Sequence, residues 1–244
     1  MRLLRRFSLL AMTDASSVFL QILDFSQGFR IFRRKVYGKF FLDCFDVFWQ
    51  GEMIMELKGS QTEKNLLKAF AGESQARNRY SYFAKKAKKD GFEQIAAVFE
   101  GTAEHERAHA KRFFKFLKGG EVEITAVFPA GVIGSTAENL KAAAGGEHFE
   151  WEKLYPSFAR TARDEGFVSA AEAFEAIVVA ERHHEGRYLS LLKHVEAGTV
   201  FKRNGKVIWH CRKCGYTYEG TEAPSVCKAC AHPQAYFEIL SENF

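Results

Sequence analysis

The chain contains two Glu-x-x-His motifs, Glu106/His109 and Glu181/His184, and each falls within an otherwise apolar helical pattern. Residues three apart lie on the same face of a helix, so each pair can grip one metal ion from one side. One such motif could arise by chance, but these two occur at equivalent positions of an internal repeat. We interpret them as the centre of a metal site.

Two further carboxylates, Glu73 and Glu147, fall in the apolar stripes of two other expected helices. Unpaired carboxylates are costly to bury, so four of them require protonation or bound cations. A pair of divalent or trivalent metal ions is the simplest solution. The third expected helix also carries Glu150, three residues after Glu147, where the first helix has Ala76 after Glu73.

The alternative is a bundle with solvated Glu and His on its outer faces. We apply that interpretation to the histidines that lack a repeat partner or an inward position, namely His105, His148, His183 and His194.

Four helices are expected to position these residues, over about 60–91, 92–117, 135–158 and 167–191. Capping boxes at Ser60/Glu63 and Ser135/Glu138 predict two helix starts, and Pro156 predicts a kink. Two short-looped hairpins joined by one long crossover predict a mainly α protein with a ferritin-like four-helix bundle, whose di-iron members use this ligand set.

An internal repeat supports the two hairpins. At an offset of 75 residues, matching pairs include Tyr80/Tyr155, Phe83/Phe158, Gly91/Gly166, Phe99/Phe174, Glu106/Glu181 and His109/His184. The bundle is therefore expected to be two copies of one helical hairpin.

Near the C-terminus, two C-x-x-C pairs supply Cys211, Cys214, Cys227 and Cys230, preceded by an expected strand at 207–209. This spacing predicts tetrahedral four-sulfur coordination of zinc or a single iron. A structural zinc ribbon is the alternative for such a module by itself. Beside a di-iron bundle, a redox-active iron is the better interpretation, because the bundle needs electrons.

Composition excludes several classes. The net charge of +5 is mild and unclustered, so nucleic-acid binding is not expected. No stretch reaches the roughly 20 apolar residues of a membrane span. Paired C-x-x-C motifs indicate a reducing compartment, and we expect the cytoplasm, with Cys44 an inert thiol.

Three segments are expected. Residues 1–54 mix Arg and Phe without a clear period, and we predict that they are an extension upstream of a natural start at Met53 or Met55. Residues 55–200 are expected to form the bundle, and residues 201–244 a small rubredoxin-like β module.

From about residue 55 to 244 the chain closely resembles the rubrerythrin family. The resemblance lies in the stretches at 71–80, 106–109, 146–150, 155–160, 181–184 and 230–233. It implies two irons in the bundle, with Glu106 and Glu181 bridging, Glu73 and Glu147 terminal, and His184 on one iron. At the other iron Glu150 and His109 would alternate with oxidation state. Tyr80 and Tyr155 would hold carboxylates in place, and the four cysteines would bind a third iron.

The resemblance also implies an activity, reduction of hydrogen peroxide to water in oxidative-stress defence of an anaerobe. Electrons would come through the cysteine-bound iron from a donor protein, either an NADH–rubredoxin reductase or a rubredoxin. No glycine-rich dinucleotide motif occurs in the chain, so it should not bind NADH itself. A homodimer or higher homo-oligomer is implied. The alternatives are a ferroxidase or iron-handling protein, and a zinc-loaded structural protein.

Overall fold

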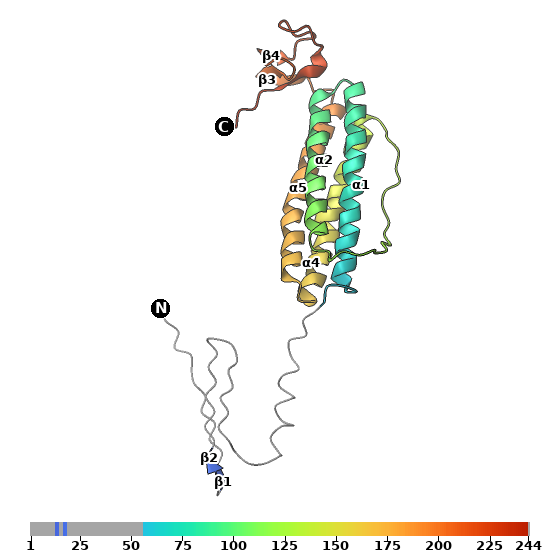
Figure 1. Cartoon of the computed structure of the whole chain (residues 1–244). Coiled ribbons are helices and arrows are strands. Elements are labelled where there is room, and N and C mark those ends of the chain that lie inside the picture. The colour runs from blue at the N-terminus through green and yellow to red at the C-terminus, as the bar shows by residue number, and fades with distance from the viewer. Residues whose placement is uncertain (1–12, 15–16, 19–55, 244) are drawn as a thin grey trace. The chain divides into compact units, whose positions relative to one another are not determined.

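The computed structural model describes residues 13–14, 17–18 and 56–243 (Figure 1). Met55–Phe244 form one compact unit, so the expected division at residue 200 stays a prediction. Strands β1 (Thr13–Asp14) and β2 (Ser17–Val18) pair antiparallel. The predictions for the 1–54 extension and for Cys44 otherwise lie outside the described residues.

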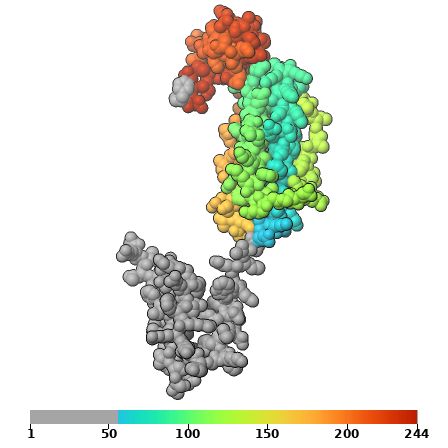
Figure 2. Space-filling model, in the orientation of Figure 1, coloured from blue at the N-terminus to red at the C-terminus, as the bar shows by residue number. Residues whose placement is uncertain are grey.

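The predicted four-helix bundle is confirmed. It consists of α1 (Gln61–Lys89), α2 (Glu93–Phe114), a third helix in three consecutive parts, and α5 (Val168–Glu196). The three parts are α3 (Thr136–Phe149), the π-helical turn η1 (Glu150–Leu154) and α4 (Tyr155–Asp164). The long crossover between α2 and α3 runs over the outside of the bundle (Figure 2). At Gly72 of α1, an added Cβ would meet the ring of Phe128 from this crossover.

Local signals set the helix ends. Ser135 and Glu138 form the expected capping box, with each side chain bonded to the other's backbone N–H. At Ser60 only half of the expected box forms, because the Glu63 carboxylate accepts from the N–H of Gly59 instead. α1 and α4 are followed by Gly91 and Gly166, whose φ angles of 86° and 79° need the freedom of glycine.

The repeat is visible in the core as two aromatic clusters. One contains Tyr80, Phe83, Phe99 and Tyr188, and the other contains Tyr155, Phe158, Phe174 and Phe113. The members correspond pairwise at the offset of 75. Along α1, α2 and α5, residues on one side of the inward glutamates belong to the first cluster and residues on the other side to the second. The carboxylates therefore lie between two apolar layers.

The irregularity expected at Pro156 takes the form of the π turn that ends just before Tyr155. Seven residues separate Glu73 from Tyr80, but eight separate Glu147 from Tyr155. The extra residue is absorbed where the N–H of Tyr155 donates to the carbonyl of Glu150, five residues back. A π turn of this kind is the usual result of inserting one residue into an α-helix.

The C-terminal module is a small antiparallel sheet of order β4-β3-β5, formed by β3 (Lys202–Cys211), β4 (Thr217–Glu222) and β5 (Phe237–Ile239). The 3₁₀ turn η2 (Gln234–Tyr236) precedes β5. The expected strand at 207–209 is confirmed but extends further. Trp209 and Phe237 are fully buried beside Cys211 and Cys227, so the apolar core of the module supports its cysteines.

Among the described residues, no helix combines the length and apolar character that crossing a bilayer requires.

We predict that Ser135→Ala destabilises the bundle by about 1 kcal/mol, because the first turn of α3 loses its cap. Denaturant unfolding would measure this, with Ser190→Ala, an exposed site in the middle of α5, as the control. Equal effects of the two changes would show that the cap contributes nothing.

Candidate metal centres

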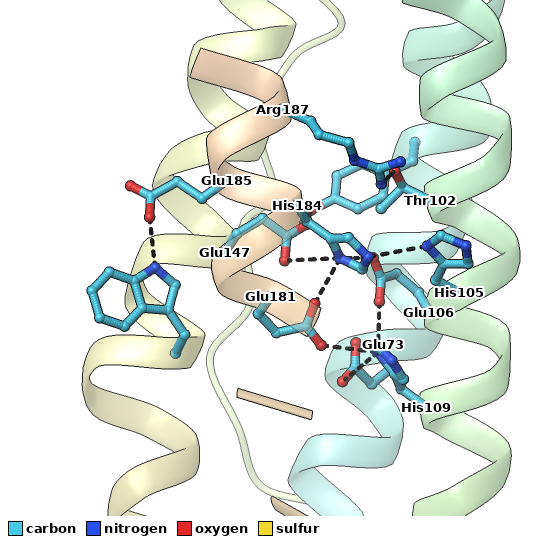
Figure 3. Close-up of polar contacts among 12 residues, drawn as sticks. Glu73, Thr102, His105, Glu106, His109, Glu147, Glu181, His184, Glu185 and Arg187 are labelled. Atoms are coloured by element: carbon cyan, nitrogen blue, oxygen red, sulfur yellow. Dashed lines mark hydrogen bonds and ion pairs between the residues drawn. The ribbon is translucent and has the colours of Figure 1, made fainter. Parts of the chain in front are cut away.

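The helices bring six of the seven predicted bundle ligands together. Glu73 comes from α1, Glu106 and His109 from α2, Glu147 from α3, and Glu181 and His184 from α5 (Figure 3). They form two groups in which the potential ligand atoms lie within 4.8 Å of one another. Glu106 and Glu181 belong to both groups, so they are the two residues that the groups share.

Each group is centred on one histidine nitrogen. His109 Nδ1 lies 2.9 Å from Glu181 Oε1, 3.0 Å from Glu106 Oε2 and 3.9 Å from Glu73 Oε1. His184 Nδ1 lies 2.7 Å from Glu181 Oε2, 3.3 Å from Glu106 Oε1 and 3.9 Å from Glu147 Oε2. The two arrangements are related by the repeat, which gives two equivalent positions for metal ions.

The donor atoms fit a pair of cations. All four glutamates are at most 1% exposed. Several of their oxygens, and one histidine nitrogen, are buried without a properly directed hydrogen bond despite the short distances: Glu73 Oε2, Glu106 Oε1, Glu147 Oε2, Glu181 Oε1 and Oε2, and His184 Nδ1. Buried polar atoms are rarely left in this way, so the atoms converge on ions that they would coordinate.

The pKa values show how protons alone neutralise the negative charge of the same cluster. Burial, together with the charges of neighbouring glutamates, raises the pKa of Glu73 well above its usual range. Burial also raises the pKa of Glu147, to about 8. For Glu181, close contacts with His109 and His184 and their positive charge outweigh burial and lower the pKa to about 2.

The two histidines carry the compensating positive charge. Burial alone would lower their pKa values, but contacts with the glutamates outweigh it. The pKa of His109 rises to about 9 and that of His184 to about 12. Protons and cations therefore compete for the same atoms.

Two tyrosines donate hydrogen bonds to the outer carboxylates, Glu147 and Glu73. Tyr80 donates its hydroxyl hydrogen to Glu147 Oε1, and Tyr155 donates to Glu73 Oε1. Both tyrosines are buried within the aromatic clusters, which fix the direction of each hydroxyl. Partners of this kind orient metal ligands.

Glu150, the seventh predicted ligand, belongs to neither group. It is the first residue of the π turn and lies three residues after Glu147. Its pKa is raised well above its usual range by burial and by the charges of Glu147 and Glu181, so its carboxyl is close enough to respond to the site. The structure places it beside the ligand set rather than in it.

The sequence pattern did not predict a contact of His105. His105 is exposed, as expected for an outer-face residue, but its Nδ1 lies 3.0 Å from His184 Nε2 and the two rings stack. Next to them, Arg187 donates to the hydroxyl of buried Thr102 (Figure 3). The repeat gave no signal for His105, because its counterpart is Ala180.

The four cysteines of the module also fit a metal ion. Cys211 and Cys230 have their Sγ atoms 3.8 Å apart, and those of Cys214 and Cys227 are 3.7 Å apart. A tetrahedron with metal–sulfur bonds of 2.3 Å has edges of about 3.8 Å, whereas a disulfide needs about 2 Å. Burial would raise the pKa of Cys227, but the N–H groups of Cys230 and Ala229 outweigh it and lower the pKa to about 7.

Together, the carboxylate and histidine pair inside a four-helix bundle and the four-cysteine module define a ferritin-like di-iron protein with a rubredoxin-like iron site. Comparison with known proteins makes the class specific. The family model described as Rubrerythrin matches residues 64–192, and the one described as Rubrerythrin, rubredoxin-like domain matches residues 209–238. The chain belongs to the rubrerythrin family.

Individual relatives agree with this. A rubrerythrin of Porphyromonas gingivalis is 61% identical over 193 residues, covering 79% of this chain and 96% of the relative. One from Nitratidesulfovibrio vulgaris is 58% identical over 188 residues, covering 77% and 98%. Among solved structures, fully reduced, all-ferrous nigerythrin matches with a TM-score of 0.50 and 32% identity, covering 75% of this chain and 91% of that one.

We predict that Glu106→Ala and Glu181→Ala each remove both irons of the pair, because each glutamate belongs to both ligand groups. Iron analysis with Mössbauer spectroscopy should then find only the cysteine-bound iron. Glu104→Ala, an exposed site on α2, is the matched control and should keep all the iron. Full retention of the pair in either bridging variant would contradict the assignment.

A second prediction concerns pH. In the metal-free chain, the folded pKa values of about 9 for His109 and about 12 for His184 exceed the ordinary 6.5. The contribution of these histidines to the free energy of unfolding is therefore complete below pH 6.5 and declines above it. Glu147, raised to about 8 from 4.5, acts in the same direction. Glu181, lowered to about 2, loses its contribution only as the pH falls below 4.5.

The melting temperature of the metal-free chain should therefore fall between pH 6.5 and 9. That of the iron-loaded chain should change less, because bound ions replace the protons. Differential scanning calorimetry across this range would measure both, and parallel curves would contradict the prediction.

Proposed function

We propose that this chain reduces hydrogen peroxide to water at the di-iron pair, using electrons that enter through the cysteine-bound iron. One observation carries the proposal: the same chain contains two overlapping groups of carboxylate and histidine ligands that share two glutamates, and a separate four-cysteine group suited to one-electron chemistry. A ferroxidase takes its electrons from the iron it oxidises, so it has no use for the second site. The balance is H₂O₂ + 2 e⁻ + 2 H⁺ → 2 H₂O.

When bound, the irons would supply the electrons and act as a Lewis acid and template for the O–O bond. The residues of the chain hold that arrangement. Glu106 and Glu181, which belong to both ligand groups, would be shared by the two ions, while Tyr80 and Tyr155 would hold Glu147 and Glu73 in place. Carboxylates suit both ferrous and ferric ions because they can change their mode of binding.

The two histidines are proposed to differ in mobility. His184 is held from behind by His105, 3.0 Å away. The residue equivalent to His105 behind His109 is Ala180, which offers no hydrogen-bonding group. This difference supports His184 as a constant ligand and His109 as the one that alternates with Glu150.

Within one chain the two sites are far apart. The module contacts the start of α2, where the rings of Phe92 and Phe201 stack with centroids 6.1 Å apart. Fourteen residues of helix separate Phe92 from Glu106, a rise of about 20 Å. Because electron transfer slows steeply with distance, we propose that the module of one subunit serves the bundle of another in a homodimer or higher homo-oligomer.

The electrons are proposed to come from a separate donor protein, an NADH–rubredoxin reductase or a rubredoxin. The proposed place of action is the reducing cytoplasm, because thiolate ligation requires reduced cysteines.

The test uses the full chain with its iron quantified. Cys214→Ser should remove the cysteine-bound iron, so the reduced pair should still be oxidised once by peroxide but should not turn over with donor protein and NADH. Lys213→Ala, an exposed neighbour in the same knuckle, should turn over normally.

Stopped-flow absorbance and steady-state peroxide consumption would give both readouts. Release of the irons on oxidation would favour a ferroxidase, and a colourless zinc-filled cysteine site a structural protein. Normal turnover of Cys214→Ser would overturn the proposed electron route.

A further inference from the structure

The π turn η1 lies next to the candidate iron pair and is only partly enclosed by the bundle. Leu154, at the end of η1, packs against the apolar core, whereas Glu150 and Trp151, at its start, are only partly buried and are absent from the apolar clusters. Its first residue, Glu150, is the carboxylate that stands beside the ligand set. Whatever holds this turn therefore determines how far Glu150 is from the irons.

Polar contacts to α5 hold the start of the turn. The indole N–H of Trp151 donates to Glu185 Oε2 at 2.6 Å, the bond drawn to Glu185 in Figure 3. The guanidinium of Arg182 covers the indole, 5.4 Å from its ring centroid. Only 16% of the Glu185 side chain is exposed, so solvent competes weakly for its carboxylate.

The same carboxylate reaches a second residue of the third helix. His148 Nδ1 lies 3.0 Å from Glu185 Oε1, and its ring packs edge-on against Trp151 with centroids 5.1 Å apart. His148 and Trp151 directly follow the predicted ligands Glu147 and Glu150, and Glu185 directly follows His184. We call Glu185, Trp151 and His148 the outer clamp.

The repeat shows that the outer clamp belongs to one half of the bundle. The counterpart of Glu185 in the first hairpin is Ala110, which cannot accept a hydrogen bond through its side chain. The first hairpin also has no π turn between Glu73 and Tyr80. The clamp and the turn that it holds thus occur together.

We propose that Glu185 is a positioning residue which, through Trp151 and His148, holds the π turn against α5 and so disfavours the state in which the Glu150 carboxylate binds iron. The inference rests on the alternation of Glu150 and His109 in the proposed function. A further anionic ligand stabilises ferric over ferrous iron. Loss of the clamp therefore lets Glu150 approach and lowers the reduction potential of the pair.

The test measures potentials in the iron-loaded full chain. Trp151→Phe removes the indole donor and keeps an aromatic ring, while Glu185→Ala removes the acceptor of both contacts. Glu175→Ala is the matched control, since Glu175 lies on the same helix and pairs with Arg163 at the bundle surface. The midpoint potential of the pair is followed by spectroelectrochemical titration, with the cysteine-bound iron as internal reference.

We expect both clamp variants to shift the potential of the pair downward, with the cysteine-bound iron unchanged and Glu175→Ala like the parent chain. An unchanged or raised potential in Trp151→Phe overturns the proposal, even if Glu185→Ala fails to retain iron. Because no peroxide is present, failure here leaves the proposed peroxidase activity standing. Equally, a failed peroxidase test would not alter the measured potentials.

Discussion

Negative charge enclosed in an apolar interior is the constraint on which the bundle depends. Four glutamates lie between two aromatic layers, at most 1% exposed, and their repulsion must be balanced locally. Without metal, protons achieve this balance on His109, His184 and some of the carboxyls. With metal, two cations do so. The pKa shifts of Glu147 and Glu181 are opposite because burial dominates at Glu147, whereas Glu181 lies beside both positively charged histidines.

The site is symmetric in its ligands and asymmetric in its supports. The repeat relates Glu106 to Glu181 and His109 to His184, and each outer glutamate receives one tyrosine hydroxyl. Around this frame the second half has an inserted residue and the polar contact to Glu185, and only its ligand His184 is backed by a further histidine, His105 from the first half.

The sequence was a good guide wherever a period or a spacing was involved. Helical stripes and the repeat predicted the bundle and six residues that the structure brings together. The C-x-x-C spacing predicted the group of four cysteines. What it missed was local: the hydrogen bond from Gly59 to Glu63 replaced half of a capping box. The π turn was foreseen only as a kink at Pro156, although the change of offset between Glu147 and Tyr155 already contained it. Contacts of His105 and Glu185 depend on side-chain direction across helices, which no one-dimensional pattern encodes.

The division of ligands between the hairpins has a further meaning. One group takes Glu73, Glu106 and His109 from the first hairpin and only Glu181 from the second, while the other group reverses this proportion. Each hairpin thus supplies three of the four residues of one ligand group and a single carboxylate of the other. Neither hairpin alone supplies the full ligand group of either position, so the centre forms only when the two hairpins pack together.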